Sequence, residues 1–173
     1  MSFPRRLLLL GSASAVAGCG FHPVYGPLAK GSGTVRPELA SIFVAVMPER
    51  QGQLLRQALQ RRFEGTDASV SKRYELTGGL GISAEGLGIQ QDNSSTRVRV
   101  NGSCTWNLTE LGSTPKLLTT GSARATDGYD VNNQQYFATD LENSATIRRL
   151  AETIADQITL DLAVYFRRRA EAV

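Results

Sequence analysis

The residues best placed to do chemistry are the four that run from Val16 to Cys19, Val-Ala-Gly-Cys. In this order an aliphatic residue and two small residues precede a thiol that can accept a diacylglyceryl group. The small Gly18 lets a peptidase cleave between Gly18 and Cys19, and the freed amine of Cys19 can take a further acyl chain. We therefore predict that the mature chain begins at a lipidated Cys19.

The residues before this cysteine have the composition of an export signal. Arg5 and Arg6 supply a positive start, and Leu7–Leu10 opens an apolar run that is shorter than the 20 or so residues that span a bilayer. Together with the four closing residues, this matches a bacterial lipoprotein signal peptide over residues 1–18. Gly20, and not an aspartate, follows the cysteine, so nothing signals retention in the inner membrane. The paired arginines also suit the twin-arginine route, so both Sec and twin-arginine export stay open.

Other residues that match motifs of catalysis or cofactor binding lack the neighbouring residues or elements that such sites need. His22, the only histidine, has no second ligand beside it, so neither a metal centre nor a triad is expected. Gly79–Ala84 matches a dinucleotide-binding pattern, but no helix start follows, and we interpret Gly79–Ile89 as a flexible hairpin or a bulged pair of strands. Cys104 falls on an apolar face and is predicted to be a buried small hydrophobe. We predict a non-enzymatic binding protein without metal or cofactor.

The overall composition also argues against nucleic-acid binding. The 173 residues suit one domain and carry a net charge of +3, but removing residues 1–18 leaves 17 basic against 16 acidic residues. No basic stripe is interleaved with aromatic residues. The run Arg167–Arg169 is expected on the last turn of a helix, where cations complement the helix dipole.

Apolar residues at periods of two and near 3.6 predict the elements that position these residues. They are a strand over Ser41–Met47, a helix from Pro48 to Gly65, a strand over Tyr74–Ile82, a turn at Asp92–Ser95, a strand over Thr96–Thr109, a strand from Lys116 to about Asp127 that Gly121 interrupts, and a helix over Ile147–Phe166. Residues 19–37 are expected to form a lipidated tether, and residues 38–173 one domain. We predict an α+β fold in which two amphipathic helices pack on one face of a mixed or antiparallel sheet of about four strands.

The strand over Thr96–Thr109 shows strict alternation. Its apolar face holds Thr96, Val98, Val100, Gly102, Cys104, Trp106 and Leu108, and its polar face holds Arg97, Arg99, Asn101, Ser103, Thr105, Asn107 and Thr109. This pattern predicts a sheet with one face on the core and the other in water.

The start of the expected mature chain, Cys-Gly-Phe-His-Pro-Val-Tyr-Gly over residues 19–26, resembles the LptE family of lipopolysaccharide-assembly lipoproteins in its alphaproteobacterial form. The strand over Arg97–Asn107 and the order of elements across the mature chain are similar too. The resemblance implies a non-enzymatic, periplasm-facing lipoprotein of the outer membrane. Such a protein plugs the β-barrel LptD, assists its assembly, binds lipopolysaccharide and helps insert it.

Arg97 and Arg99 are our candidate contacts with lipopolysaccharide or the barrel; the alternative is a solvated sheet face. The contact positions of enteric members are not transferred, because Gln90, Gln91 and Asp92 occupy the loop before this strand. Two other functions stay open, an auxiliary lipoprotein of an ABC-type lipid transport system and a pilotin that escorts a secretin.

Overall fold

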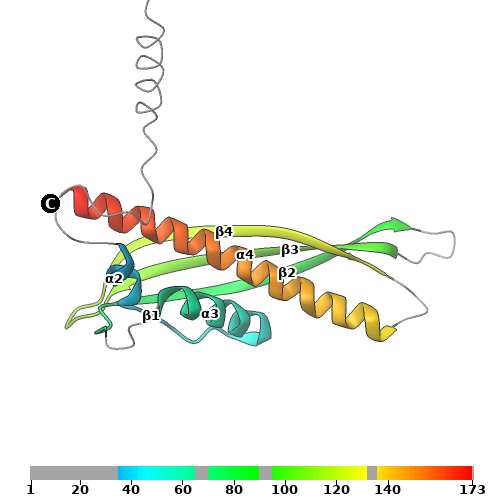
Figure 1. Ribbon diagram of the computed structural model, residues 1–173, viewed down its shortest axis with the longest axis horizontal. Helices are drawn as coiled ribbons and strands as arrows, with labels where there is room; N and C mark the ends of the chain where they lie inside the picture. Colours follow the sequence, from blue (N-terminus) through cyan, green and yellow to red (C-terminus); the bar gives the residue numbers. More distant parts are fainter. Residues whose placement is uncertain (1–34, 65–69, 90–94, 132–135, 173) are drawn as a thin grey trace, which may run out of the picture.

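The structure is a computed structural model that describes four stretches of the chain, residues 35–64, 70–89, 95–131 and 136–172. Within them the elements are α2 (Val35–Ala40), β1 (Ile42–Val44), α3 (Glu49–Phe63), β2 (Tyr74–Ile89), β3 (Ser95–Glu110), β4 (Lys116–Asp130) and α4 (Tyr136–Glu171). The strands form one sheet in the order β1-β2-β3-β4, in which β1 is parallel to β2 and the other neighbours are antiparallel. Helices α3 and α4 pack on one face of this sheet (Figure 1). The predicted α+β class is confirmed.

Strand β3 alternates as predicted. The side chains that face the helices are 3% exposed or less at Val100, Cys104, Trp106 and Leu108. The exposed residues between them are Arg97, Arg99, Ser103, Thr105 and Asn107. Because a slip of one residue would exchange the two faces, burial of the apolar set specifies the register of this strand.

The prediction of a hairpin or bulged strand pair over Gly79–Ile89 is wrong. Strand β2 runs on to Ile89 and pairs with β3 from Tyr74 opposite Glu110 to Ile89 opposite Ser95. Five glycines between positions 78 and 88 obscured the period-two pattern, since a glycine has no side chain to assign to either face. The predicted turn at Asp92–Ser95 lies outside the described residues except for Ser95, which begins β3.

Helix α4 is longer than the apolar stripe predicted. Its 36 residues correspond to a length of about 54 Å. The predicted stripe is buried at Leu150, Ala151, Ile154, Ile158, Leu162 and Phe166. Before Thr146 no side chain of the helix is buried, so its first turns extend beyond the described core.

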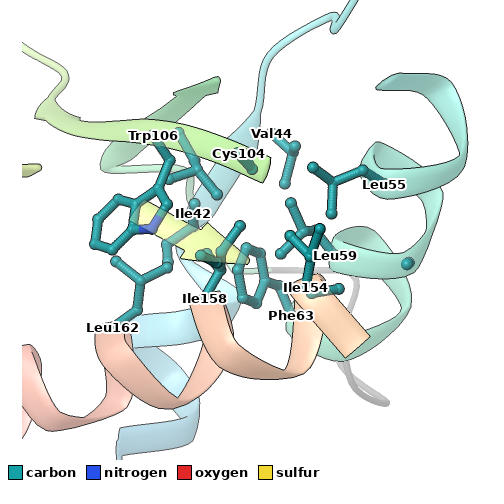
Figure 2. Packing of buried hydrophobic residues seen from close by; sticks show 14 of the residues in the cluster. Ile42, Val44, Leu55, Leu59, Phe63, Cys104, Trp106, Ile154, Ile158 and Leu162 are labelled. Carbon is teal, nitrogen blue, oxygen red and sulfur yellow. The ribbon is translucent and has the colours of Figure 1, made fainter. Parts of the chain in front are cut away.

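The core lies between the sheet and the two long helices. Figure 2 shows Leu55, Leu59 and Phe63 of α3 gathering with Ile154 and Ile158 of α4 under the strands. These side chains are at most 2% exposed, and each contributes roughly 1.5–3 kcal/mol of hydrophobic stabilisation.

An ion-pair cluster joins the outer surfaces of the same two helices. The guanidinium of Arg62 donates from Nη1 to Glu152 Oε2 at 2.8 Å and from Nε to Asp156 Oδ1 at 2.7 Å. The hydrogen bond to Asp156 raises the pKa of Arg62 and, with Glu152, outweighs the opposing effect of burial. The pairs hold α3 and α4 in register.

Helix α2 is an element that the sequence analysis did not predict. Residues 35–37, expected in the tether, form its first turn, and Val35 and Leu39 are buried at 1% and 3% exposure. Tyr74 at the start of β2 donates a hydrogen bond from its hydroxyl to Glu38 at 3.1 Å. The packed part of the chain therefore includes Val35.

Candidate functional site

The helices leave one broad surface of the sheet uncovered, which we call the open face. In the paired register two members of this face are apolar, Leu87 opposite Arg97 and Leu117 opposite Thr109. Its other members on the three long strands are polar or small: Thr77, Gly79, Gly81, Ser83 and Glu85 of β2, Arg97, Arg99, Asn101, Ser103, Thr105 and Asn107 of β3, and Thr120, Ser122, Arg124, Thr126, Gly128 and Asp130 of β4. The open face is therefore a hydrogen-bonding surface.

Arg99 occupies the middle strand of the open face and is paired with the strand beside it. Its Nη1 donates to Glu85 Oε1 at 3.0 Å, and the two residues are register partners. Their side chains are 48% and 53% exposed, so water screens the attraction between them. An exposed pair of this kind contributes about 0–1 kcal/mol, and a ligand with a stronger anionic group can replace the carboxylate.

Arg97 is paired more weakly, with the strand on the other side. Its Nε lies 3.8 Å from Asp130 Oδ1, and the side chains are 63% and 83% exposed. Between β4 and β3 on the same face, the hydroxyl of Thr126 donates a hydrogen bond to Asn101 Oδ1 at 2.8 Å. The structure thus places the two predicted arginines two residues apart on the exposed face of β3, with each guanidinium in reach of solvent.

Asp127 lies beside this surface, on the side of the sheet that the helices cover. Burial opposes its ionisation, but hydrogen bonds from Arg149 Nε at 2.7 Å and from the Gly128 N–H at 2.8 Å outweigh burial and lower its pKa. The Arg149 guanidinium also donates to the Thr146 hydroxyl at 2.9 Å. This cluster joins β4 to α4 and is a structural contact.

The candidates for catalysis are placed as follows. Cys104 is 1% exposed, as predicted, and burial raises the pKa of its thiol despite an opposing backbone hydrogen bond from Gly79. A buried neutral thiol is a poor nucleophile. Cys19, Gly18 and His22 lie outside the described residues.

Residues 35–64, 70–89, 95–131 and 136–172 lack two further features. Within them no group of three or more histidine, cysteine or acidic residues is arranged to hold a metal ion. Among the helices of the same stretches, none is long and apolar enough to cross a membrane.

Sequence reasoning missed the carboxylates that partner the two arginines. Glu85 belonged to the segment interpreted as a hairpin, and Asp130 lay beyond the predicted end of the fourth strand. Only the pairing register places Glu85 opposite Arg99 and Asp130 opposite Arg97. The alternation of each strand was visible in the sequence, but the partner of each residue was not.

Comparison with known proteins adds the following. The family LptE, described as lipopolysaccharide-assembly, matches residues 39–162. A putative lipoprotein from Caulobacter crescentus CB15 has a similar structure, with a TM-score of 0.62 and 23% identity over 76% of this chain and 94% of that chain. The rare lipoprotein B from Shewanella oneidensis gives a TM-score of 0.52 and 11% identity over 71% of this chain and 93% of that chain. No match was found among curated proteins.

Proposed function

Because the chain belongs to the LptE family of lipopolysaccharide-assembly proteins, we propose that it is an outer-membrane lipoprotein that assists the assembly of an LptD-like β-barrel and plugs its lumen. In this role it helps insert lipopolysaccharide at the outer membrane without catalysing a reaction. The family and the lipoprotein fold support a role in lipopolysaccharide transport at that membrane. We further propose the barrel partner, the lipid on Cys19 and the contact residues.

The observation that carries the proposal is the polar open face on three strands of 15 or 16 residues. The interior of an outer-membrane barrel is polar and holds water, so a plug needs a surface of hydrogen-bonding side chains and not a large apolar patch. The open face offers such a surface along β2, β3 and β4. A soluble partner with an apolar groove would require the opposite character.

Arg97 and Arg99 are the residues of this face that we assign to an anionic ligand. Lipopolysaccharide carries phosphate and carboxylate groups, which a guanidinium binds through paired, charge-assisted hydrogen bonds. The present partners, Asp130 and Glu85, are exposed carboxylates that can be exchanged at small cost. The alternative is that both pairs merely solubilise the sheet.

A charge reversal separates these two possibilities. The variant Arg97→Glu with Arg99→Glu is compared with a control of equal charge, Arg50→Glu with Arg148→Glu, which changes two exposed helix residues. If the proposal is right, the first variant folds and stays anchored but recovers less barrel protein or binds lipopolysaccharide at least about tenfold more weakly. If it recovers the barrel and binds lipopolysaccharide as the control does, the two arginines are a solvated surface and the assignment fails.

A further inference from the structure

One end of the molecule gathers cations and exposed leucines where the chain enters from Cys19, and we propose that this end docks on the anionic phospholipid headgroups of the leaflet that holds the lipid anchor. We call it the basic end. It consists of α2, residues 72–75, residues 110–117 and the last turn of α4. The proposal concerns a surface separate from Arg97 and Arg99, and it rests on the proposed lipidation of Cys19.

Contacts between distant segments bring this end together. Strand β2 begins, β3 ends and β4 begins here, since Tyr74 pairs with Glu110 and Glu110 with Lys116. The last turn of α4 lies against the same strands, since Arg169 Nη2 is 3.8 Å from Glu110 Oε1. One turn earlier in the helix, the centroid of the Phe166 ring lies 5.1 Å from that of Tyr74. Helix α2 lies beside them, as Figure 1 shows, and its Glu38 accepts a hydrogen bond from Arg73 at 2.8 Å.

The end carries an excess of positive charge. Its exposed cations are Arg36, Lys72, Arg73, Lys116, Arg168 and Arg169. Its carboxylates are Glu38, Glu75, Glu110 and Glu171. Three of these acids already form ion pairs: Glu38 with Arg73, Glu110 with Arg169, and Glu171 with Arg167.

Three of the cations are available to an external anion. Arg36, Lys116 and Arg168 form no ion pair within the stretches that the structure describes, and all three are exposed. Near an anionic lipid surface each such cation adds a favourable interaction that falls off within a Debye length. The dipole of α4 explains why cations suit its last turn, but it does not explain those on α2 and β4.

Two exposed leucines flank the turn between β3 and β4 at the same end. Leu111 is 42% and Leu117 59% exposed. The Leu111 N–H donates to the Arg73 carbonyl at 2.8 Å, which holds the turn against the basic segment. Apolar side chains among cations are the combination that binds an anionic membrane interface, because both burial and charge favour the same surface.

The position of the anchor favours a lipid surface as the occupant. Val35 comes 16 residues after the lipid site at Cys19, and the chain between them spans at most about 55 Å when extended. The chain therefore enters the domain at the basic end, within reach of the leaflet in which its acyl chains are held. Tethering raises the local concentration of that surface, so weak contacts are sufficient for docking.

Vesicle flotation tests the proposal. The protein used is the mature chain with Cys19→Ser, which carries no acyl chains, and circular dichroism confirms that each variant is folded. We expect the protein to bind vesicles of phosphatidylcholine that contain about 30% phosphatidylglycerol. Binding to vesicles of pure phosphatidylcholine should be at least about tenfold weaker. The variant Arg36→Glu, Lys116→Glu and Arg168→Glu should lose at least about tenfold in affinity. The matched control is Arg50→Glu, Arg61→Glu and Arg148→Glu, three exposed helix residues outside the basic end and the open face, and it should bind as the parent chain does.

A second pair of variants tests the leucines. Leu111→Ser with Leu117→Ser should weaken binding several-fold, whereas Leu141→Ser with Tyr136→Ser, which changes exposed apolar residues at the start of α4, should not. Equal binding to neutral and anionic vesicles, or equal losses in the basic-end and control variants, would overturn the proposal. So would binding that requires added lipopolysaccharide. Because the acyl chains are absent from this assay, a failure of docking is distinguishable from a failure of the barrel or Cys19 assignments.

Discussion

The indole of Trp106 lies over the α-carbon of Gly121, its register partner on β4, so closely that a β-carbon at Gly121 would stand 2.7 Å from Cε2 and nearer still to Cζ2. Trp106 is 3% exposed and packs near Leu162 of α4 (Figure 2). The glycine that interrupts the apolar pattern of the fourth strand thus makes room for the ring.

Replacing Gly121 by alanine should therefore destabilise the fold. The added methyl group must displace a buried ring, and overpacking of this kind costs about 1–3 kcal/mol. The control is Gly112→Ala, where a β-carbon would meet nothing within 4 Å. Urea unfolding of both variants measures the difference. Equal free energies of unfolding would mean that Trp106 does not occupy this position.

Removing the ring itself should cost more. Trp106→Ala empties a buried site and should lower the free energy of unfolding by about 3–5 kcal/mol. Arg99→Ala changes an exposed residue of the same strand and should stay within about 0.5 kcal/mol of the parent. Thermal melts that show the reverse order would indicate that the two faces of β3 are exchanged.

The sequence predicts an element of the fold where the pattern of apolar and polar residues within that element is clear. The alternation around Cys104 and Trp106 specifies a face for each residue from Arg97 to Leu108 of β3, and the structure agrees. Glycines carry no such signal, so the continuation of β2 to Ile89 was missed. The first ten residues of α4 bury no side chain, so no apolar stripe marked its start at Tyr136.

The candidate site was predictable only in part. The sequence alone places Arg97 and Arg99 together on an exposed face, because residues two apart on a strand point the same way. Their pairing with Asp130 and Glu85 depends on the register between strands, which arises from packing of the whole sheet. The gathering of cations at the basic end depends on tertiary contacts between α2, β2 and α4 and left no local pattern.

Cys104 should be protected from thiol reagents while the protein is folded. Burial raises its pKa and keeps reagents away, so alkylation needs at least local unfolding. We expect iodoacetamide to label it at least about a thousandfold more slowly in buffer than in urea. Labelling is followed by mass spectrometry at Cys104 itself. A native rate near the unfolded rate would contradict the assigned burial.

The Asp127 cluster should contribute stability that is lost in acid. The pKa of Asp127 in the folded protein is lowered from its ordinary value of 3.8. As the pH falls, the carboxylate of the unfolded chain therefore takes up a proton before that of the folded chain does. The contribution is fully present well above pH 3.8 and is lost as the pH falls through the folded pKa. Asp127→Asn should therefore be less stable than the parent near pH 6, by about 1 kcal/mol. This deficit should shrink below about pH 4 in urea unfolding. A difference that is constant with pH would rule out the ionised carboxylate as its source.

The lipid on Cys19 should appear in the mass of the mature protein. We expect the chain to begin at Cys19 and to carry a diacylglyceryl group, with or without a further acyl chain on its amine. Cys19→Ser should remain unmodified and leave the membrane fraction on extraction with salt, because basic-end contacts alone are weakened by screening. A mature protein that begins at Met1 without lipid would remove the anchor from the account.

The most direct measurement of the proposed function is a photocrosslink in living cells from the centre of the open face. A photoreactive amino acid at Thr105, which is exposed on β3, reports whatever covers that strand. We predict an adduct with an LptD-like outer-membrane barrel, identified by mass spectrometry after purification of this chain. An adduct with a component of a lipid ABC transport system or with a secretin, in place of the barrel, would contradict the account.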